Sequence, residues 1–587
     1  MRGYVLRGVL GVAILLATLA APTTILGGPA STAAPVAARS AQRLDATIEA
    51  GVRRSFQRDK WNVVIVLTDD QPVNMLGTMP TVRRELAGNG VTYPNAHVPT
   101  SLCCPSRSSL LTGLLAPRTN VYDNHGRHGG FRGFRRYGNR TKMFSLPLQG
   151  AGYRTGYFGK YLNQYEDAYD GSAEPGWDVW RAVASKTTYR NFSVTRPYSS
   201  QDRSRIDRGR RPKRAATVRT SRHDTEEHGR AAAEFIRKTK RKQPLLAMVS
   251  VKAPHLPATA AARDLGQTAD DSAWWDNPAV GESDISDKPR WVQEATYMGP
   301  SHKKNQARVR RQMMETLHGV DRSVGRIIGA LKKTKRWNRT LFMFTSDNGW
   351  ASGEHNLVGK YAPYRAQTDV PLIVRYGNLV RGRNTDQRSV AANVDLTATA
   401  MQAGGVFDTN RDGVSMVGAP RTGVPLTGTK RSGRPPYCGW RTSEGLFVRY
   451  GSGEEEFYDL RIDPQELENR IEDSSLTGVI TGYRLAASRG CSPPPPGFGP
   501  SFWRPSWRYP GDDEPEPQPH PGPSPTPTMP LPSIGASPTF SEPTPSATPT
   551  PSGTTQTPTP SPSDSSPSAS ATGTVEPTRS EEPTATG

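Results

Sequence analysis

The sequence predicts an α/β fold: a large domain with a central, mostly parallel mixed sheet flanked by helices, and a smaller C-terminal α+β subdomain with an antiparallel sheet. The first observation is a set of four short apolar runs with the character of buried strands. These runs cover residues 61–67, 245–251, 340–345 and 370–375. The second is that helical stretches at about 226–240 and 303–335 lie between them, as in parallel sheets. The third is a pair of alternating segments, 446–450 and 456–460, which predict a hairpin after the pattern changes near Gly405.

The two ends of the chain predict export and a disordered tail. Residues 1–34 have the features of a secretory signal peptide, because two arginines precede a short apolar run and small residues follow it. That run is shorter than the roughly 20 residues of a membrane-spanning helix, which makes an N-terminal anchor the weaker alternative. Residues 493–587 hold 27 of the 53 prolines, among Ser and Thr, and cannot bury a core. We therefore expect a secreted or extracellular protein.

The remaining boundaries follow from composition. A polar lead-in is expected at 35–59, the large domain at 60–405 and the C-terminal subdomain at 406–491. The formal net charge is +21, and residues 186–222 form a basic insertion with twelve Lys and Arg against two Asp. This insertion is either a solvated loop or a contact for a polyanion such as a sulfated glycan or an anionic wall polymer. It lacks the spacing of nucleic-acid-binding modules, so no nucleic acid partner is expected.

The four cysteines are too few for a disulfide scaffold. Cys438 and Cys491 can pair near the end of the globular part, whereas Cys103 and Cys104 are adjacent and isolated, which suggests chemistry. Pro105 suits the first turn of a helix that ends at Gly113. Cys103 would then lie just before a helix N-terminus, where an unmodified thiol is expected to have a lowered pKa, as in a cysteine hydrolase with a nearby His base.

Polar groups follow three of the predicted strands. They are Asp69 and Asp70, His255, and Asp347 with Asn348. The carboxyl ends of parallel strands share one edge of a sheet, where ligands bind. The acids and the amide supply only oxygen ligands, which favours Ca²⁺, or Mg²⁺, over Zn²⁺. Either pair alone is equally typical of a turn or a helix cap.

The segment Cys103-Cys104-Pro105-Ser106-Arg107, followed by Leu111-Thr112-Gly113, resembles the signature of the sulfatases. The resemblance covers roughly residues 60–470 in the expected order. Its other parts are Asp69-Asp70, Gly159-Lys160, Lys252-Ala253-Pro254-His255, Asp347-Asn348-Gly349, Lys360, and Phe457-Tyr458-Asp459-Leu460 with Asp463-Pro464. The run Gly159 to Tyr165 resembles most the glucosamine-6-sulfatase and heparan endosulfatase branch.

This resemblance implies a formylglycine-dependent, type I sulfatase of the alkaline-phosphatase-like superfamily, with its catalytic domain at 60–405. A formylglycine-generating enzyme would convert Cys103 to formylglycine. One hydroxyl of the hydrated aldehyde would attack the sulfur of a sulfate ester and expel the alcohol, and loss of a proton from the other hydroxyl would then release sulfate and restore the aldehyde. The implied ligands of Ca²⁺ (or Mg²⁺) are Asp69, Asp70, residue 103, Asp347 and Asn348.

The resemblance also implies roles for the surrounding cations. Arg107 would orient the formylglycine, and Lys160 and Lys360 would bind the sulfate group. His255 would bind the sulfate or protonate the leaving oxygen, and His355 would be a further substrate contact. Many arylsulfatases have a histidine where this chain has Leu162, so a two-histidine acid scheme does not carry over.

The leading hypothesis is therefore a secreted, Ca²⁺-dependent sulfuric ester hydrolase that acts on a sulfated sugar or glycan. One alternative is a phosphodiesterase or phosphonate monoester hydrolase of the same superfamily. The other is a non-catalytic exported protein that binds polyanions through residues 186–222.

Overall fold

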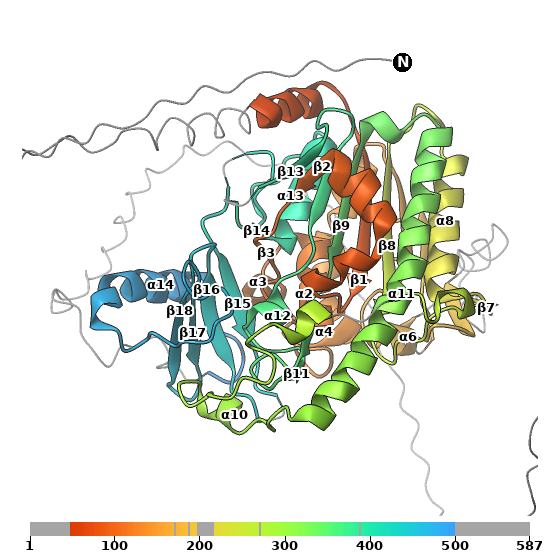
Figure 1. Cartoon of the computed structure of the whole chain (residues 1–587). Coiled ribbons are helices and arrows are strands. Elements are labelled where there is room, and N and C mark those ends of the chain that lie inside the picture. Colours follow the sequence, from red (N-terminus) through yellow and green to blue (C-terminus); the bar gives the residue numbers. More distant parts are fainter. Residues whose placement is uncertain are drawn as a thin grey trace, which may run out of the picture. The chain divides into compact units, whose positions relative to one another are not determined.

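The computed structural model describes residues 47–498, except 170–171, 186–187, 196–216, 269–271, 387–388, 419 and 432 (Figure 1). The expected signal peptide, most of the basic insertion and nearly all of the Pro-rich tail lie outside the described residues. The chain divides into two units after Trp507, and the second unit lies wholly outside them. Within the expected lead-in, residues 47–58 are helical, so its described part is not an irregular segment.

An eight-stranded sheet in the order β13-β2-β12-β9-β1-β8-β4-β5 forms the centre of the fold. Its strands are β1 (Asn62–Asp69), β2 (Gly90–Thr92), β4 (Arg154–Gly159), β5 (Val179–Ala182), β8 (Leu245–Pro254), β9 (Thr340–Ser346), β12 (Ile373–Tyr376) and β13 (Arg383–Thr385). The five strands from β9 to β5 run parallel, whereas β12 is antiparallel to both of its neighbours. The mostly parallel mixed sheet is thus confirmed, with the run at 370–375 forming a shorter strand of opposite direction.

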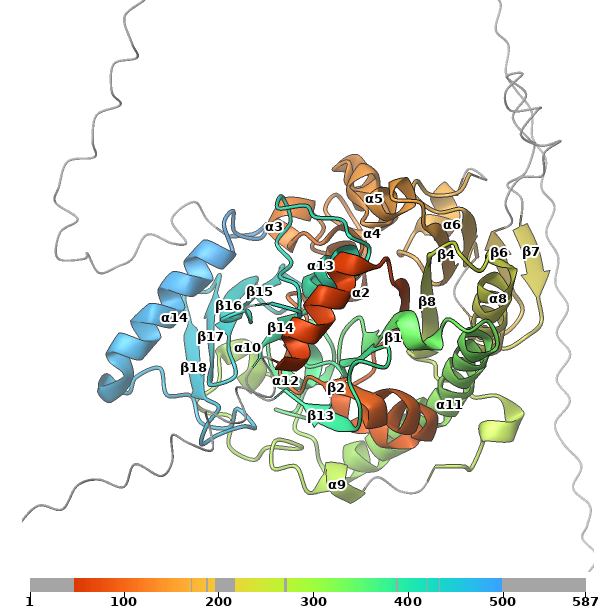
Figure 2. The same ribbon diagram turned by 90° about the horizontal axis from the view of Figure 1, so that it is seen from above.

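Helices cover both faces of this sheet, which explains why its central strands β1, β8 and β9 are buried and largely apolar. Alternate residues of β1 point to opposite sides. Val63, Ile65 and Leu67 pack with α2 (Cys103–Thr112) and α13 (Asn393–Ala403). Val64 and Val66 pack with α8 (Asp224–Lys238) and α11 (Pro300–Lys333), which lie together on the other side of the sheet (Figure 2).

The connections contain short elements. The helices are α3 (Ala116–Thr119), α4 (Gly130–Arg136), α5 (Ser145–Gly150), α6 (Tyr165–Ala168), α9 (Ser272–Trp275), α10 (Arg290–Gln293) and α12 (Arg365–Thr368). The strands are β3 (Ala96–His97), β6 (Phe192–Thr195), β7 (Thr217–Thr220), β10 (Ala351–Ser352), β11 (Val358–Gly359) and β14 (Ala391–Ala392). β6 and β7 pair on either side of residues 196–216, so the described ends of the basic insertion form a two-stranded ribbon.

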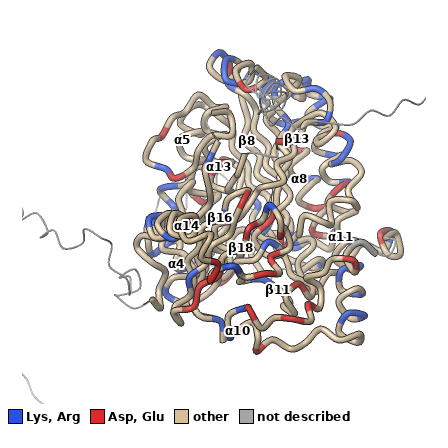
Figure 3. Tube along the Cα trace, turned by 60° about the vertical axis from the view of Figure 1, so that its left-hand side comes forward, with Lys and Arg blue, Asp and Glu red and all other residues tan. Residues whose placement is uncertain are grey.

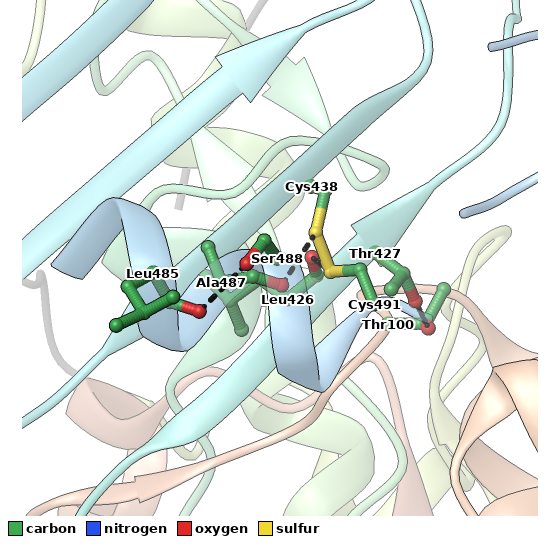
Figure 4. The surroundings of a disulfide bond; sticks show 8 residues. All are labelled: Thr100, Leu426, Thr427, Cys438, Leu485, Ala487, Ser488 and Cys491. Carbon is green, nitrogen blue, oxygen red and sulfur yellow. Dashed lines mark hydrogen bonds between the residues drawn. A yellow bond between two sulfur atoms is a disulfide. The ribbon is translucent and has the colours of Figure 1, made fainter. Parts of the chain in front are cut away.

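The C-terminal part forms a four-stranded antiparallel sheet with one covering helix, as the sequence predicts. Its elements are β15 (Val424–Gly428), β16 (Tyr437–Arg441), β17 (Gly445–Tyr450), β18 (Glu455–Asp459) and α14 (Thr477–Gly490). β17 and β18 are the expected hairpin. Cys491, just after α14, forms a disulfide with Cys438 on β16, which confirms that these two cysteines pair (Figure 4).

The outer helices are amphipathic and charged. α8 has acidic residues in its first turn and basic residues in its last, so its end charges interact favourably with the helix dipole (Figure 3). α11 is 34 residues long, but its outer face is strongly polar. Among the helices in the described part of the chain, none has both the length and the apolar character that crossing a bilayer requires.

Candidate active site

Polar side chains follow four neighbouring strands at the carboxyl edge of the sheet. In spatial order, β9 leads into Asp347 and Asn348, β1 ends at Asp69 and Asp70, β8 leads to His255, and β4 leads to Lys160. These strands are all parallel, so their carboxyl ends lie together. The predicted convergence is therefore confirmed, and Lys160 joins it because β4, which the apolar pattern did not reveal, lies next to β8.

Cys103 enters this edge from α2. It is the first residue of the helix, not the residue before it, and Gly113 ends the helix with a positive φ of 69°. All ten residues of α2 are buried. The Sγ atom of Cys103 lies 3.4 Å from Oδ1 of Asp69 and 2.9 Å from Nζ of Lys360.

The environment of Cys103 does not favour a thiolate. Burial raises the pKa of its thiol far above the usual value, although Lys160 and Lys360 act in the opposite direction. The expectation of a lowered thiol pKa is therefore wrong, because loss of solvation outweighs the helix terminus and the two lysines. A plain cysteine hydrolase is disfavoured by the same observation.

The oxygen groups form a compact cluster suited to a hard cation. Ligand atoms of Asp69, Asp70, Asp347 and Cys103 all lie within 4.8 Å of one another, and all four residues are buried. Oδ2 of Asp70 and Oδ1 of Asn348 are buried without a hydrogen-bond partner among the described residues. Buried acceptors are normally satisfied, so these two atoms fit the coordination of Ca²⁺ or Mg²⁺. Asp70 adopts a positive φ of 67°, the turn that places its carboxylate beside those of its neighbours.

The carboxylates differ in their electrostatic surroundings. Burial alone would raise the pKa of Asp69, but Lys160, His255 and Arg107 outweigh it and hold that pKa well below the usual value. Burial and the charge of Asp69 raise the pKa of Asp347 to about 6 despite Arg107. A bound divalent cation would offset the repulsion between Asp347 and the neighbouring carboxylates.

Arg107 connects the strand ends to one another. Its Nε donates to Oδ2 of Asp347 at 2.7 Å, and its Nη1 donates to the carbonyl oxygen of Lys160 at 2.9 Å and to Oγ of Ser250 at 2.6 Å. Among the described residues it has no hydrogen bond to Cys103. The contacts thus show Arg107 positioning the metal-ligand candidates, while its direct role in orienting formylglycine stays a prediction.

The two predicted sulfate-binding lysines both reach the cluster. Lys160 forms an ion pair with Asp69, and Nζ of Lys360 lies 2.6 Å from Oδ1 of Asp70. With Arg107 they balance the three carboxylates, so a divalent cation would leave the site positive. That is the polarity an anionic ester requires.

His255 faces the same cluster from β8. Its Nδ1 donates to the carbonyl oxygen of Leu256 at 2.5 Å, which directs Nε2 toward Oδ2 of Asp70 at 3.6 Å. Nζ of Lys252, a residue of the motif with no role expected from the sequence, lies 3.5 Å from Nδ1 of His255. The place of Lys252 as the first residue of the Lys-Ala-Pro-His run, three residues before His255, was the available signal. Burial lowers the pKa of His255 despite the nearby carboxylates Asp70 and Asp69.

His355 does not join this cluster. Its Nδ1 lies 2.6 Å from Oε2 of Glu282, and its ring packs on Tyr364 with 4.6 Å between centroids. It lines a separate cavity of about 470 Å³ with Trp274 and Glu354. Within the described part of the chain, it has no hydrogen bond or ion pair to the other predicted site residues.

Two cavities of about 340 Å³ each open beside His255. The first is lined by His255, Trp350, Val358, Gly359, Lys360, Tyr361, Arg431 and Arg434. The second is lined by His125, Lys160, Tyr161, Leu162, Asn163, Gln164, Glu166, Asp167, Val183, Lys252 and His255. Each cavity is lined by a lysine that pairs with a carboxylate of the oxygen cluster, Lys360 in the first and Lys160 in the second. Arg431 and Arg434 were missed by sequence reasoning, because no motif marks the loop between β15 and β16.

Replacing Gly159 by alanine is expected to disrupt the site. Gly159 has a φ of 118°, and an added Cβ would lie 1.8 Å from the carbonyl oxygen of Ser250, the same oxygen that accepts the Lys160 amide at 2.8 Å. We expect a loss of about 2 kcal/mol or more in unfolding free energy, together with most activity. Thermal and denaturant unfolding measure the first effect. Gly150→Ala is the control, because nothing lies within 4 Å of its Cβ position; equal stability of both variants would contradict this account.

Comparison with known proteins agrees with this geometry. The family model described as Sulfatase matches residues 61–406, more than half of the chain. The chain belongs to the sulfatase family. This sulfatase-family chain is 29% identical over 352 residues to a protein from Drosophila melanogaster named extracellular sulfatase SULF-1 homolog, covering 59% of the chain and 30% of the relative. It is 28% identical over 382 residues to human N-acetylglucosamine-6-sulfatase, covering 63% and 65% respectively.

A solved structure shares the fold. It was determined in complex with its substrate D-glucosamine-2-N,6-O-disulfate and superimposes with a TM-score of 0.61 at 18% identity, covering 74% of this chain and 98% of that one. The predicted family and the alkaline-phosphatase-like α/β fold are thus confirmed. The chain spans 30% and 65% of the lengths of the two named relatives, so their similarity concerns part of each protein.

Proposed function

We propose that this protein is a sulfuric ester hydrolase that cleaves sulfate esters of a sulfated sugar or glycan, using formylglycine made from Cys103 and a Ca²⁺ ion. The observation that carries the proposal is the position of residue 103. Its side chain lies beside Asp69, Asp70 and Asp347 and in contact with Lys360, in a buried cluster with two unsatisfied oxygen acceptors.

The oxygen cluster would hold the ion. Asp69, Asp70, Asp347, Asn348 and the oxygen that replaces Sγ of residue 103 would be its ligands, and Mg²⁺ is the alternative occupant. The ion would supply positive charge that polarises the nucleophile and the sulfate group. The formylglycine hydrate would supply one hydroxyl to attack sulfur and a second whose deprotonation releases sulfate.

The side chains of the chain itself would bind and protonate the substrate. Lys160, paired with Asp69, and Lys360, paired with Asp70, would hold the sulfate oxygens. His255 keeps Nδ1 on a backbone carbonyl, so its Nε2 is the atom that would transfer a proton to the leaving oxygen. Lys252, close to that ring, would disfavour the protonated imidazole through its positive charge and so promote transfer of the proton to the leaving oxygen.

The relatives support a sugar substrate. Two of them are named as an extracellular sulfatase and an N-acetylglucosamine-6-sulfatase, and the solved structure holds a doubly sulfated glucosamine. We further propose secretion through the signal peptide at 1–34, maturation by a formylglycine-generating enzyme, and a polyanion contact by the basic insertion. The domain boundaries predicted above are part of the same proposal.

An assay of paired substrates tests the function. We expect natively matured protein to hydrolyse an aryl sulfate and a sulfated monosaccharide far faster than an aryl phosphodiester or phosphonate monoester. The mass of the peptide that contains residue 103 should show an aldehyde in place of the thiol. Preference for the phosphodiester would establish the alternative hydrolase, and an unmodified thiol in active protein would refute the mechanism.

A further inference from the structure

The cavity beside Lys360 has an unusual lining. It shares His255 and Lys360 with the proposed catalytic cluster, so a substrate whose sulfate lies on that cluster would extend into it. Its other polar walls come from Arg431 and Arg434, while Trp350 and Tyr361 provide flat apolar surfaces. No carboxylate lines it among the described residues.

Two of its three fixed cations already have anionic partners. Lys360 pairs with Asp70, and Nη1 of Arg431 lies 2.6 Å from Oδ1 of Asp123, while the Arg431 guanidinium stacks 4.1 Å from the Tyr361 ring centroid. These contacts commit Lys360 to the catalytic cluster and Arg431 to Asp123.

Arg434 is the exception. Its Nη1 donates to the carbonyl oxygen of Lys360, and its guanidinium lies 5.4 Å from the ring of Trp291. The ionisable groups around it are tyrosines, which are neutral near pH 7, and within the described part of the chain no carboxylate lies at ion-pair distance. A largely buried cation without a counter-ion is costly, and an oxyanion is the ligand that a guanidinium fork binds best.

The second cavity provides a contrast. It contains Lys160 and Lys252, but Glu166 and Asp167 also line it, with the amides of Asn163 and Gln164. Such a mixed wall suits hydroxyl, amide or amine groups of a sugar. Among the described residues Lys252 also lacks an ion pair, but carboxylates stand in the same wall, so the cavity that has a cation and no carboxylate in its lining is the one at Arg434.

We propose that the cavity at Arg434 is a subsite for a second anionic group of the substrate, so that the enzyme prefers sugars bearing an additional sulfate, sulfamate or carboxylate. This inference rests on the proposed function and specifies its substrate class. Arg434 acts as a specificity-determining residue, and the three oxyanions share the chemistry that it recognises.

The test uses sulfated monosaccharides that share one cleavable sulfate ester and differ in a second substituent: a neutral acetamide, a sulfamate or a carboxylate. The full-length, natively matured protein should show a higher kcat/KM for one of the dianionic sugars than for the neutral one. Arg434→Gln should lower that preference about tenfold, and Arg434→Lys should restore part of it. Which dianionic sugar responds identifies the group that the subsite binds.

Arg375→Gln is the matched control. Arg375 also donates to a backbone carbonyl, that of Trp337, and stacks 3.7 Å from the centroid of that indole, but it does not line the cavity. It should leave the preference unchanged. A preference that stays within twofold in Arg434→Gln, or falls equally in Arg375→Gln, would overturn the inference.

Binding separates this inference from the proposed function. Calorimetry with Cys103→Ala measures the same sugars without turnover, and the dianionic sugar should bind more tightly than the neutral one, by a margin that Arg434→Gln removes. If the wild-type protein hydrolyses none of the sugars but this margin is present, the function fails and the subsite stands. Equal binding of both sugars refutes the subsite.

Discussion

Replacing Cys103 by alanine is expected to abolish sulfate ester hydrolysis, with a fall of at least about a thousandfold in kcat. Residue 103 provides the only nucleophile in the proposed mechanism, and its side chain lies 3.4 Å from Asp69 and 2.9 Å from Lys360. The substitution removes one sulfur atom from a buried helix N-terminus, so the fold should remain. Initial rates on an aryl sulfate, with circular dichroism and thermal unfolding as checks, measure the effect.

Cys104→Ala is a closely matched control. Cys104 is equally buried and adjacent in sequence, but its Sγ accepts from the amide of Asn163 at 3.2 Å and does not face the carboxylates. It should keep turnover within about tenfold of wild type, with the aldehyde still present at residue 103. Activity that survives in Cys103→Ala, or vanishes equally in both variants, would refute the assigned nucleophile.

Replacing Asp347 by alanine is expected to remove metal dependence together with most of the activity, about a hundredfold or more. Asp347 is the proposed ligand that also accepts hydrogen bonds from Arg107 and from the amide of Asp70. In wild type, chelator should lower activity and Ca²⁺ should restore it. The melting temperature should rise with Ca²⁺, because an ion that binds only the folded state stabilises it.

Asp321→Asn separates metal binding from general damage. Asp321, on α11, is also a buried carboxylate, and it accepts hydrogen bonds from the amides of Thr81 and Val82. It lies on the face of the sheet opposite α2. This variant should be less stable yet keep the Ca²⁺-dependent rise in melting temperature, whereas Asp347→Ala should lose that rise. Full activity in chelator, for wild type or for Asp347→Ala, would contradict the proposed ion site.

Local patterns were sufficient for much of the fold and for the acidic part of the site. The run 61–67 is apolar except at Asn62 because both faces of β1 are covered, and this made the strand predictable without a structure. Strand β4 escaped notice because two of its six residues are glycines. The direction of β12 also could not be inferred, since pairing between distant segments decides it and leaves no local periodicity.

Side-chain electrostatics diverged most from expectation. A helix N-terminus predicts an acidic thiol, yet burial raises the pKa of Cys103. His355 is near Lys360 in the sequence, yet it turns to Glu282. Both outcomes depend on what surrounds a group in three dimensions, and that environment comes mainly from residues far away along the chain.

From residue types and their spacing alone, this chain could be recognised as an α/β sulfatase-like protein with Cys103 beside an oxygen-rich cation site, because motif residues at strand ends carry that information locally. The unpaired charge of Arg434, the bridging role of Arg107 and the contact of Lys252 with His255 emerged only once distant segments were packed together. Charge balance and solvation are sums over all neighbours of a group, and in a folded chain most of those neighbours are remote in sequence.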